Sequence, residues 1–447
     1  MPIRSPFRDE LSGLVRLALP VVAAQVGMVL LGVIDTIMVG RLTPQALAAV
    51  ALGSIFTFGT MILAIGILHG LDPLVAQAFG AGERDEIGLH LQRGIVLGLV
   101  LSIPYLLLFL KSEPLLRLFH QPPEVVALAG PFIRALAPGV PALFVFVALR
   151  QTLQAMSVVR PVLLAVLIAN VVNFVGNLAL IYGRFGLPAL GVVGSGFSTT
   201  ICRFVMVAAV ALLGAPSLKS VWRRPTRRLL HPAPYGRLLS IGFPIGIQIG
   251  LEMWVFTTAA LVIGTMGAIE LAGHQIAINL ASLSFMVPLG IGAAAAVRVG
   301  NAVGRGDQAG ARRAAWVALG AGASVMLLSA TAFALMPAML ARIYTPDPRV
   351  IAVASTLIPI AALFQVFDGT QAVGCGILRG IADTRVAAAI NLVGYWALGL
   401  PLGVGLAFRL GMGPRGLWWG LTVGLAIVAV LVSLRIAVRF RRAIARV

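Results

Sequence analysis

The chain alternates between long apolar runs and short segments that carry most of its charged residues. Twelve apolar runs come close to the roughly 20 residues that an α-helix needs to cross a bilayer. Segments rich in Gly, Pro and charge, such as 80–86 and 345–349, separate these runs. The pattern predicts an all-α polytopic membrane protein with twelve transmembrane helices. The predicted spans are 14–39, 46–70, 89–110, 129–149, 162–182, 190–213, 238–264, 272–297, 314–337, 351–374, 387–408 and 416–438.

The first six predicted spans resemble the last six when the chain is shifted by about 224 residues. Pro20 then falls on Pro244, and Gly82 falls on Gly306. Repeats that start on the same side of the membrane are typical of transporters whose two halves enclose a cavity. We therefore predict two pseudo-symmetric six-helix lobes around a central cavity. The predicted divisions are an N-terminal lobe at 1–213, a basic linker at 214–237 and a C-terminal lobe at 238–447.

Composition supports a lipid environment and changes the interpretation of the charge. The chain is 59% hydrophobic and 11% charged, whereas a soluble domain is about 25% charged. A net charge of +19 is also typical of nucleic-acid binding, but most of the 34 Lys and Arg residues lie in the segments on the side of both termini. Such a bias orients membrane proteins, so we expect both termini and the linker in the cytoplasm and no nucleic-acid partner.

Three of the fifteen acidic residues lie inside predicted spans, namely Asp35, Glu252 and Asp368. A carboxylate at membrane depth costs about 2.5–3.5 kcal/mol on insertion scales. The cost falls when the group binds a proton, or when it joins other oxygen ligands around a hard cation such as Na⁺. The alternative is a structural carboxyl that ties helices together. The acids therefore predict sites for proton or cation coupling, with Glu252 and Asp368 as candidate ligands of Na⁺.

Amide side chains accompany two of these acids. Asn173 and Asn177 stand four residues apart in one predicted span, so they share a helix face and offer amide oxygens to a cation or substrate. Hydrogen bonding between helices is the alternative. Gln248 stands one helical turn before Glu252 and belongs to the same candidate site.

Four other polar residues lie in the predicted spans or at their ends. Gln275 and Asn279 form a stripe on predicted span eight that suits either a substrate site or helix packing, with packing favoured. His274 is expected at the surface near the outer end of that span. Arg203, inside span six, is able to pair with an acid, extend toward the interface or contact an anionic group. The sequence leaves these three possibilities open.

Signatures of soluble enzymes are missing from the chain. Gly-rich segments at 80–82 and 304–306 resemble fragments of phosphate loops, but no Lys-Ser/Thr pair follows them. No zinc-ligand cluster, GxSxG segment or nucleophile–base arrangement is visible, so we expect neither an enzyme nor a bound cofactor. Uphill transport would then depend on an ion gradient, in which one charge crossing ~100 mV supplies ~2.3 kcal/mol.

Several separated motifs resemble one family. IDTIMVGRL at 34–42, the long segment at 272–304, LRGIADTR at 378–385 and NLVGYWALGLPLG at 391–403 resemble the multidrug and toxic compound extrusion (MATE) transporters, most of all the bacterial NorM branch. The resemblance runs from about 14 to 420. It implies twelve helices in two lobes and an antiport of cationic or amphipathic organic compounds against Na⁺ or H⁺.

The resemblance also implies roles for particular residues. The essential acids of NorM-like members match Asp35, Glu252 and Asp368, and their paired asparagines match Asn173 and Asn177. NorM-like proteins often carry Tyr four residues before the third acid. Here that position is Phe364, whose ring face is able to contact a cation but lacks a hydroxyl.

Together these features predict a secondary active multidrug efflux antiporter of the bacterial inner membrane. Its partners would be small organic cations and membrane lipid, and it would act as a monomer. Glu252 and Asp368 would form one cation site, and Asp35 with Asn173 and Asn177 a second site for protons, ions or drugs. The alternative is a lipid-linked saccharide flippase of the same superfamily, whose anionic cargo would favour a cationic cavity.

Overall fold

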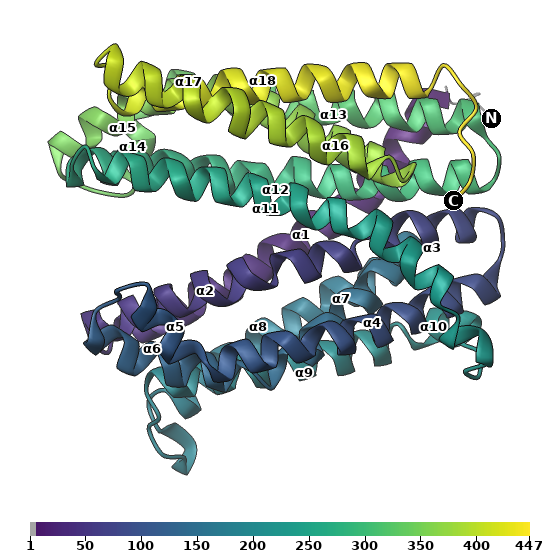
Figure 1. Ribbon diagram of the computed structural model, residues 1–447, viewed down its shortest axis with the longest axis horizontal. Coiled ribbons are helices and arrows are strands. Elements are labelled where there is room, and N and C mark those ends of the chain that lie inside the picture. Colours follow the sequence, from purple (N-terminus) through teal and green to yellow (C-terminus); the bar gives the residue numbers. More distant parts are fainter. Residues whose placement is uncertain (1–5) are drawn as a thin grey trace. The chain divides into compact units, whose positions relative to one another are not determined.

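A computed structural model of the protein describes residues 6–447, and within this range the regular elements are helices and no strand occurs. The first five residues of the predicted N-terminal lobe lie outside it. The helices follow one another along the chain as shown in Figure 1. Their bounds are α1 (Pro6–Gly40), α2 (Pro44–Leu68), α3 (Leu71–Gly80), α4 (Arg84–Leu110), α5 (Ser112–Leu118), α6 (Pro123–Leu136), α7 (Gly139–Ala155), α8 (Arg160–Leu180), α9 (Val192–Leu213), α10 (Ala215–Val221), α11 (Pro232–Gly264), α12 (Ala268–Gly304), α13 (Gln308–Leu335), α14 (Pro337–Arg342), α15 (Pro348–Gly380), α16 (Thr384–Asn391), α17 (Leu400–Val404) and α18 (Pro414–Arg439).

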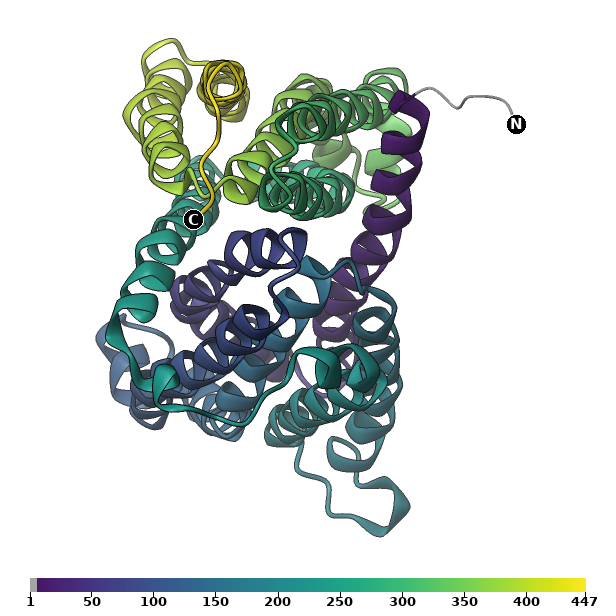
Figure 2. The ribbon, with the colours of Figure 1, turned by 90° about the vertical axis from the view of Figure 1, so that its right-hand side faces the viewer.

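Four shorter elements complete the described chain. The 3₁₀ turns η1 (Arg184–Gly186) and η2 (Arg227–Leu230) lie in connections, and the π-helical segments η3 (Leu392–Gly399) and η4 (Gly405–Arg409) flank α17. Residues 384–409 therefore form one nearly continuous helix that is α-helical at its start and π-helical in two places. Figure 2 views the neighbouring helix α18, in yellow, nearly along its axis.

Eleven helices in the described range are long and apolar enough to cross a membrane, and the number rises to twelve if one bent pair forms a single span. The bent pair is α6 with α7, which meet at 51° where the sequence predicts a single span at 129–149. Pro138 lies at this break and lacks the N–H that a continuous helix would use. The predicted all-α polytopic fold is confirmed, with this span divided.

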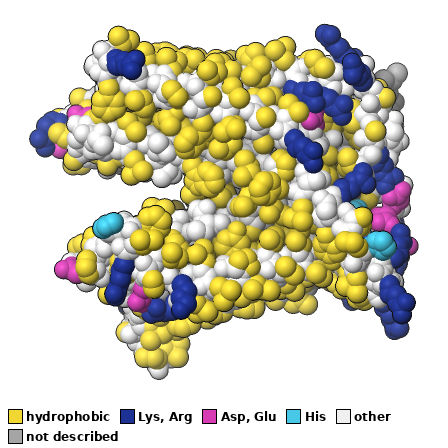
Figure 3. Space-filling model, viewed as in Figure 1, with side chains coloured by type: hydrophobic (Ala, Val, Ile, Leu, Met, Phe, Trp, Pro, Cys, Tyr) yellow, Lys and Arg dark blue, Asp and Glu magenta, His cyan; other side chains and the backbone are white. Residues whose placement is uncertain are grey.

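The burial pattern on α8 is the reverse of that on a soluble helix. Its asparagines are buried, whereas one of its apolar faces is exposed. Figure 3 shows the same arrangement more widely, because hydrophobic side chains cover most of the helix surfaces and Lys and Arg gather mainly toward helix ends. Lipid suits such exposed apolar faces. The exposed residues of α8 are Leu164, Leu167, Ile168, Val171, Phe174 and Val175.

The chain divides into two compact units. The N-terminal unit is Ala23–Gly246, and the C-terminal unit joins the residues up to Val22 with Ile247–Val447. Helices α1 and α11 each contribute residues to both units. The predicted lobe limits, 1–213 and 238–447, stay a prediction.

The predicted basic linker at 214–237 contains helix α10, turn η2 and the first turns of α11. It is tied to α4 within the N-terminal unit. Gln92 Nε2 donates to the Arg223 carbonyl at 2.7 Å, and Arg223 Nε pairs with Asp85 at 2.9 Å. The segment is therefore partly helical and attached rather than a free connection.

The internal sequence repeat is also seen in the backbone geometry of two equivalent turns. Gly82 follows α3 with φ 77°, and Gly306 follows α12 with φ 75°. In both turns the N–H of the following residue donates back to a carbonyl of the helix, at 3.0 Å and 2.9 Å. A left-handed residue that ends a helix in this way favours glycine. The two glycine-rich segments are thus helix-ending turns.

Helices α12 and α15 approach closely in the C-terminal unit. A Cβ added at Gly376 would lie 2.2 Å from the Gly292 carbonyl oxygen, and one added at Gly380 would lie 2.6 Å from the Ala296 oxygen. Small residues allow membrane helices to pack with their backbones in contact. This packing positions the middle of α15, which carries Asp368.

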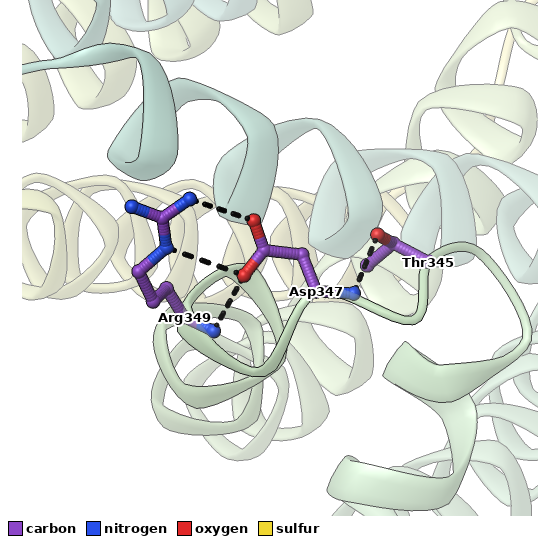
Figure 4. A network of polar contacts seen from close by, with 3 residues as sticks. All are labelled: Thr345, Asp347 and Arg349. Atoms are coloured by element: carbon purple, nitrogen blue, oxygen red, sulfur yellow. Dashed lines mark hydrogen bonds and ion pairs between the residues drawn. The ribbon is translucent and has the colours of Figure 1, made fainter.

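Helix α15 begins at a capped loop, shown in Figure 4. The Asp347 carboxylate accepts from the Arg349 backbone N–H at 2.9 Å and pairs with Arg349 Nη2 at 3.2 Å. Asp347 N in turn donates to Thr345 Oγ1 at 3.2 Å. The hydrogen bonds from the Arg349 side chain hold the pKa of Asp347 below its ordinary value.

Candidate functional site

Asp35 lies near the end of α1, within the N-terminal unit, and its carboxylate accepts three hydrogen bonds. Asn173 Nδ2 and Asn177 Nδ2 donate to Asp35 Oδ1 at 2.9 and 2.7 Å. Thr199 Oγ1 donates to Oδ2 at 2.8 Å. The acid is 8% exposed and both asparagines are fully buried. Donors from α8 and α9 therefore hydrogen-bond a buried carboxylate on α1.

The two asparagines reach Asp35 because they stand one helical turn apart on α8. Helix α8 packs along α9, where Ser198 Oγ donates to the Asn173 carbonyl at 3.2 Å. Asn177 Oδ1 is buried and has no hydrogen-bond partner among the described residues. The cluster thus retains an oxygen able to accept a further donor or to coordinate a cation.

Arg203 is a buried cation of the same unit. Its Nη1 donates to the Leu136 carbonyl at 3.4 Å, and its guanidinium interacts electrostatically with Asp35. Its side chain is 9% exposed, so it does not extend to the surface. Of the three roles left open by the sequence, the structure favours through-space pairing with an acid.

Glu252 on α11 and Asp368 on α15 come together in the C-terminal unit. Their carboxyl groups interact electrostatically with each other. Asp368 is 5% exposed, and its Oδ1 is buried without a hydrogen-bond partner among residues 6–447. Two neighbouring carboxyls cannot both carry charge in such surroundings at low cost, so the arrangement favours uptake of a proton or a cation.

A polar network extends from this pair. Gln371 on α15 hydrogen-bonds the Glu252 carboxyl and donates from Nε2 to Asn391 Oδ1 at 3.0 Å. Asn391 Nδ2 donates to Cys375 Sγ at 3.7 Å, and Gln248 hydrogen-bonds the same sulfur. Gln248, predicted for this site, therefore contacts it through the buried free thiol of Cys375.

Aromatic side chains form one side of the site. Phe364 is 1% exposed, and its ring lies 5.8 Å from Phe256 and 5.6 Å from Trp418. Phe256 also lies 6.1 Å from Tyr395, whose hydroxyl is buried without a partner among the described residues. Tyr395 interacts electrostatically with both Glu252 and Asp368. A phenol is therefore present near the acids, although position 364 itself has none.

The expectation of a surface position for His274 is wrong. The side chain is 1% exposed, and its Nδ1 accepts from Trp418 Nε1 at 3.2 Å. The close packing of α12 on α15 and the Trp418 ring, 5.8 Å from the imidazole, account for this burial, and the polarity of a lone His in an apolar segment does not reveal it.

Gln275 and Asn279 are exposed side chains of α12. They lie four residues apart on one exposed face of the helix. Their assignment to a substrate or ion site stays a prediction.

Four contributors were missed in the sequence. They are uncharged polar side chains in otherwise apolar helices, and the one local signal is a polar residue within a span. Their importance depends on which helix they face, because three of them act on an acid carried by another helix and Asn391 acts on one through Gln371. They are Thr199, Gln371, Asn391 and Tyr395.

The donor set of the C-terminal pair suits a hard monovalent ion. It comprises two carboxyl groups, with the Gln371 amide oxygen and the Tyr395 hydroxyl as neutral oxygens that lack partners among the described residues. Such oxygens are suited to Na⁺, and the carboxyls also suit H⁺. In residues 6–447 no group of three or more His, Cys, Asp or Glu side chains is arranged to hold a metal ion.

Comparisons with known proteins place the chain in a family. The MatE family model matches residues 20–179 and again 244–404, in register with the internal repeat. The chain belongs to the MatE family, as its motifs predicted.

Its similarity to individual members covers nearly the whole chain. It is 40% identical to the multidrug resistance protein NorM of Burkholderia vietnamiensis, over 94% of this chain and 92% of that protein. It is 37% identical to the multidrug resistance protein PmpM of Pseudomonas aeruginosa, over 98% and 93%. Among solved structures, the eukaryotic MATE transporter AtDTX14 matches with a TM-score of 0.89 at 26% identity, covering 98% of this chain and 99% of that one.

Proposed function

We propose that the protein is a secondary active antiporter that exports cationic or amphipathic organic compounds in exchange for Na⁺ or H⁺. The observation that carries the proposal is the Glu252–Asp368 pair, in which Asp368 is buried and one of its carboxylate oxygens has no hydrogen-bond partner among the described residues. Relatives named multidrug resistance proteins support drugs as the cargo.

In the proposed mechanism, the C-terminal pair binds the coupling ion. A bound proton or Na⁺ offsets the repulsion between the two carboxyls, and the aromatic side with Phe364 contacts the apolar part of a cation. The ion must bind the two transport states with different affinities, because equal affinities shift no equilibrium.

Asp35 provides a second acidic site in the N-terminal unit. Three neutral donors hydrogen-bond its carboxylate, so it is suited to contact the charged part of a cationic compound. The protein would act as a monomer in the bacterial inner membrane, with both termini in the cytoplasm. The bias of Lys and Arg along the sequence supports this orientation.

Efflux of a fluorescent organic cation from proteoliposomes tests the function. A Na⁺ gradient alone and a pH gradient alone are imposed in separate experiments. We expect one of them to drive dye movement in the wild type and neither to do so with Glu252→Gln. The same dye movement in protein-free vesicles as in wild-type vesicles, under both gradients, would refute the proposal.

A further inference from the structure

The π-helical segment η3 begins directly after Asn391. Side chains of this segment and of its neighbour Asn391 connect it to the acid-bearing helices α11 and α15. A π-helical turn is a locally altered hydrogen-bond register, and such turns are frequent at functional sites. Residues 384–409 therefore contain a segment able to change register.

Gln371 connects this segment to the acid. Its side chain hydrogen-bonds the Glu252 carboxyl, and its Nε2 donates to Asn391 Oδ1 at 3.0 Å. Asn391 also donates from Nδ2 to the Ala387 carbonyl at 2.8 Å, in the last turn of α16. Both amide side chains are buried, at 1% and 0% exposure. A change at the Glu252 carboxyl thus reaches the residue before η3 through two hydrogen bonds.

A second connection joins η3 to the same point of α11. Trp396, in the middle of η3, donates from Nε1 to the Leu251 carbonyl at 3.0 Å. Leu251 directly precedes Glu252 in the sequence. The π-helical segment is therefore bonded directly to Leu251 and linked to the adjacent Glu252 through Gln371 and Asn391.

The opposite side of η3 is fixed by α18. A Cβ added at Gly394 would lie 3.0 Å from the Gly424 carbonyl oxygen, and one added at Gly399 would lie 3.2 Å from Gly424 Cα. Because backbone meets backbone there, η3 has little space to move toward α18. A displacement of α11 near Glu252 would then be absorbed within η3.

We propose that Gln371, Asn391 and Trp396 are positioning residues that link the state of Glu252 to the helical register of residues 392–409. The link makes η3 the element that responds when Glu252 gains or loses a ligand. The proposal rests on the antiport function for its consequence in transport, whereas its test does not require transport.

Other groups act on Glu252 electrostatically without joining the link. They are Asp368 and Arg379 on α15, together with Cys375 and Tyr395. The experiment is carried out at one pH, and Gln371→Met and Trp396→Phe leave all of these groups in place.

The test is a double-mutant cycle read by hydrogen exchange and mass spectrometry in detergent, with peptides covering residues 392–409. Glu252→Gln removes the charge that the Gln371 amide contacts, and Gln371→Met keeps the side-chain length but removes both hydrogen bonds. We expect each to accelerate exchange in 392–409 by about tenfold, since a hydrogen bond to a charged group is among the stronger ones. The double variant should exchange no faster than either single variant.

A matched control uses another buried glutamine of α15. Gln365 Oε1 accepts from Ser284 and Ser329, on α12 and α13, at 2.7 and 3.1 Å. Gln365→Met should leave exchange in 392–409 unchanged. Exchange in α13 monitors general loosening of the unit, and a purely structural role for Gln371 would accelerate both segments equally.

Trp396→Phe provides a second variant that keeps an aromatic ring and removes the N–H donor. We expect it to accelerate exchange in 392–409 and to reduce the additional effect of Glu252→Gln. Additive effects of Glu252→Gln with both Gln371→Met and Trp396→Phe would overturn the proposal. If wild-type vesicles show no ion-driven dye efflux but the substitutions still have non-additive effects on hydrogen exchange, the antiport function alone is refuted.

Discussion

The two acidic sites solve the burial of a carboxyl group in different ways. Asp35 accepts three hydrogen bonds from Asn173, Asn177 and Thr199, so both of its oxygens have partners. In the C-terminal unit, Asp368 faces the like charge of Glu252 and keeps one oxygen without a partner among the described residues. The first site supplies hydrogen-bond donors to both carboxylate oxygens, whereas the second places two carboxyls together and is stabilised when something positive binds.

This difference assigns separate tasks to the sites. A carboxylate with its hydrogen bonds satisfied attracts a cation without requiring one. A pair of neighbouring carboxyls requires a proton or cation to lower the cost of burial. The C-terminal pair is therefore suited to the coupling ion, and Asp35 to the charged part of the cargo.

The largest expected effect follows from removing one charge of the C-terminal pair. Glu252→Gln or Asp368→Asn should reduce ion-driven dye efflux by at least about 100-fold, since the cost of one buried charge, ~2.5–3.5 kcal/mol, corresponds to that factor. Initial efflux rates in proteoliposomes measure it. Size-exclusion profiles like that of the wild type would show that the variants fold, and unchanged efflux in both would contradict the assignment.

A second effect concerns the packing on which the C-terminal pair depends. Gly376→Ala places a Cβ 2.2 Å from the Gly292 oxygen, so α12 and α15 must separate. We expect the free energy of unfolding to fall by about 2 kcal/mol, the usual size of an overpacking cost. Reversible unfolding in SDS-containing mixed micelles measures it.

Gly320→Ala is the matched control for that substitution. Gly320 lies on α13 of the same unit, and an added Cβ meets no atom within 4 Å. The control should be neutral or slightly stabilising, because Ala is the better helix former. Equal destabilisation by both substitutions would argue against close packing of α12 on α15 as the cause.

A third, smaller effect tests the hydrogen bonds around Asp35. Thr199→Val keeps the shape of the side chain and removes one of the three donors, so efflux of a cationic dye should fall by about tenfold, as expected for a bond to a charged group. The adjacent Thr200 donates to the Ala135 carbonyl instead, at 2.7 Å, and Thr200→Val serves as the control. Similar losses for both variants would mean that helix packing, rather than the contact with Asp35, is being measured.

The sequence predicts the fold better than it predicts the sites. Apolar run length is a local property, so the helices are evident from it, and the family is evident from separate motifs. The break at Pro138, in contrast, comes from a residue inside one run. The three acids are evident because charge is rare in such runs. Thr199 and Gln371 are not, because each acts on an acid of another helix, and sequence spacing does not reveal which helix faces which.

The smallest expected effect concerns Asp347, a carboxylate outside both sites that serves as a reference for them. Asp347 has a direct guanidinium partner, and the hydrogen bonds from Arg349 hold its pKa below the ordinary value of 3.8. Its stabilising contribution is therefore complete above that value and is lost as the pH falls through the lower pKa of the folded state. We expect the amides in the first turn of α15 to lose exchange protection only below about pH 4. Asp347→Asn should remove this pH dependence, and Arg349→Leu should move its midpoint upward toward 3.8. If the pH midpoint for loss of exchange protection does not change in Arg349→Leu, Arg349 does not stabilise the carboxylate. Asp347 could then no longer serve as the ion-paired reference for Asp35.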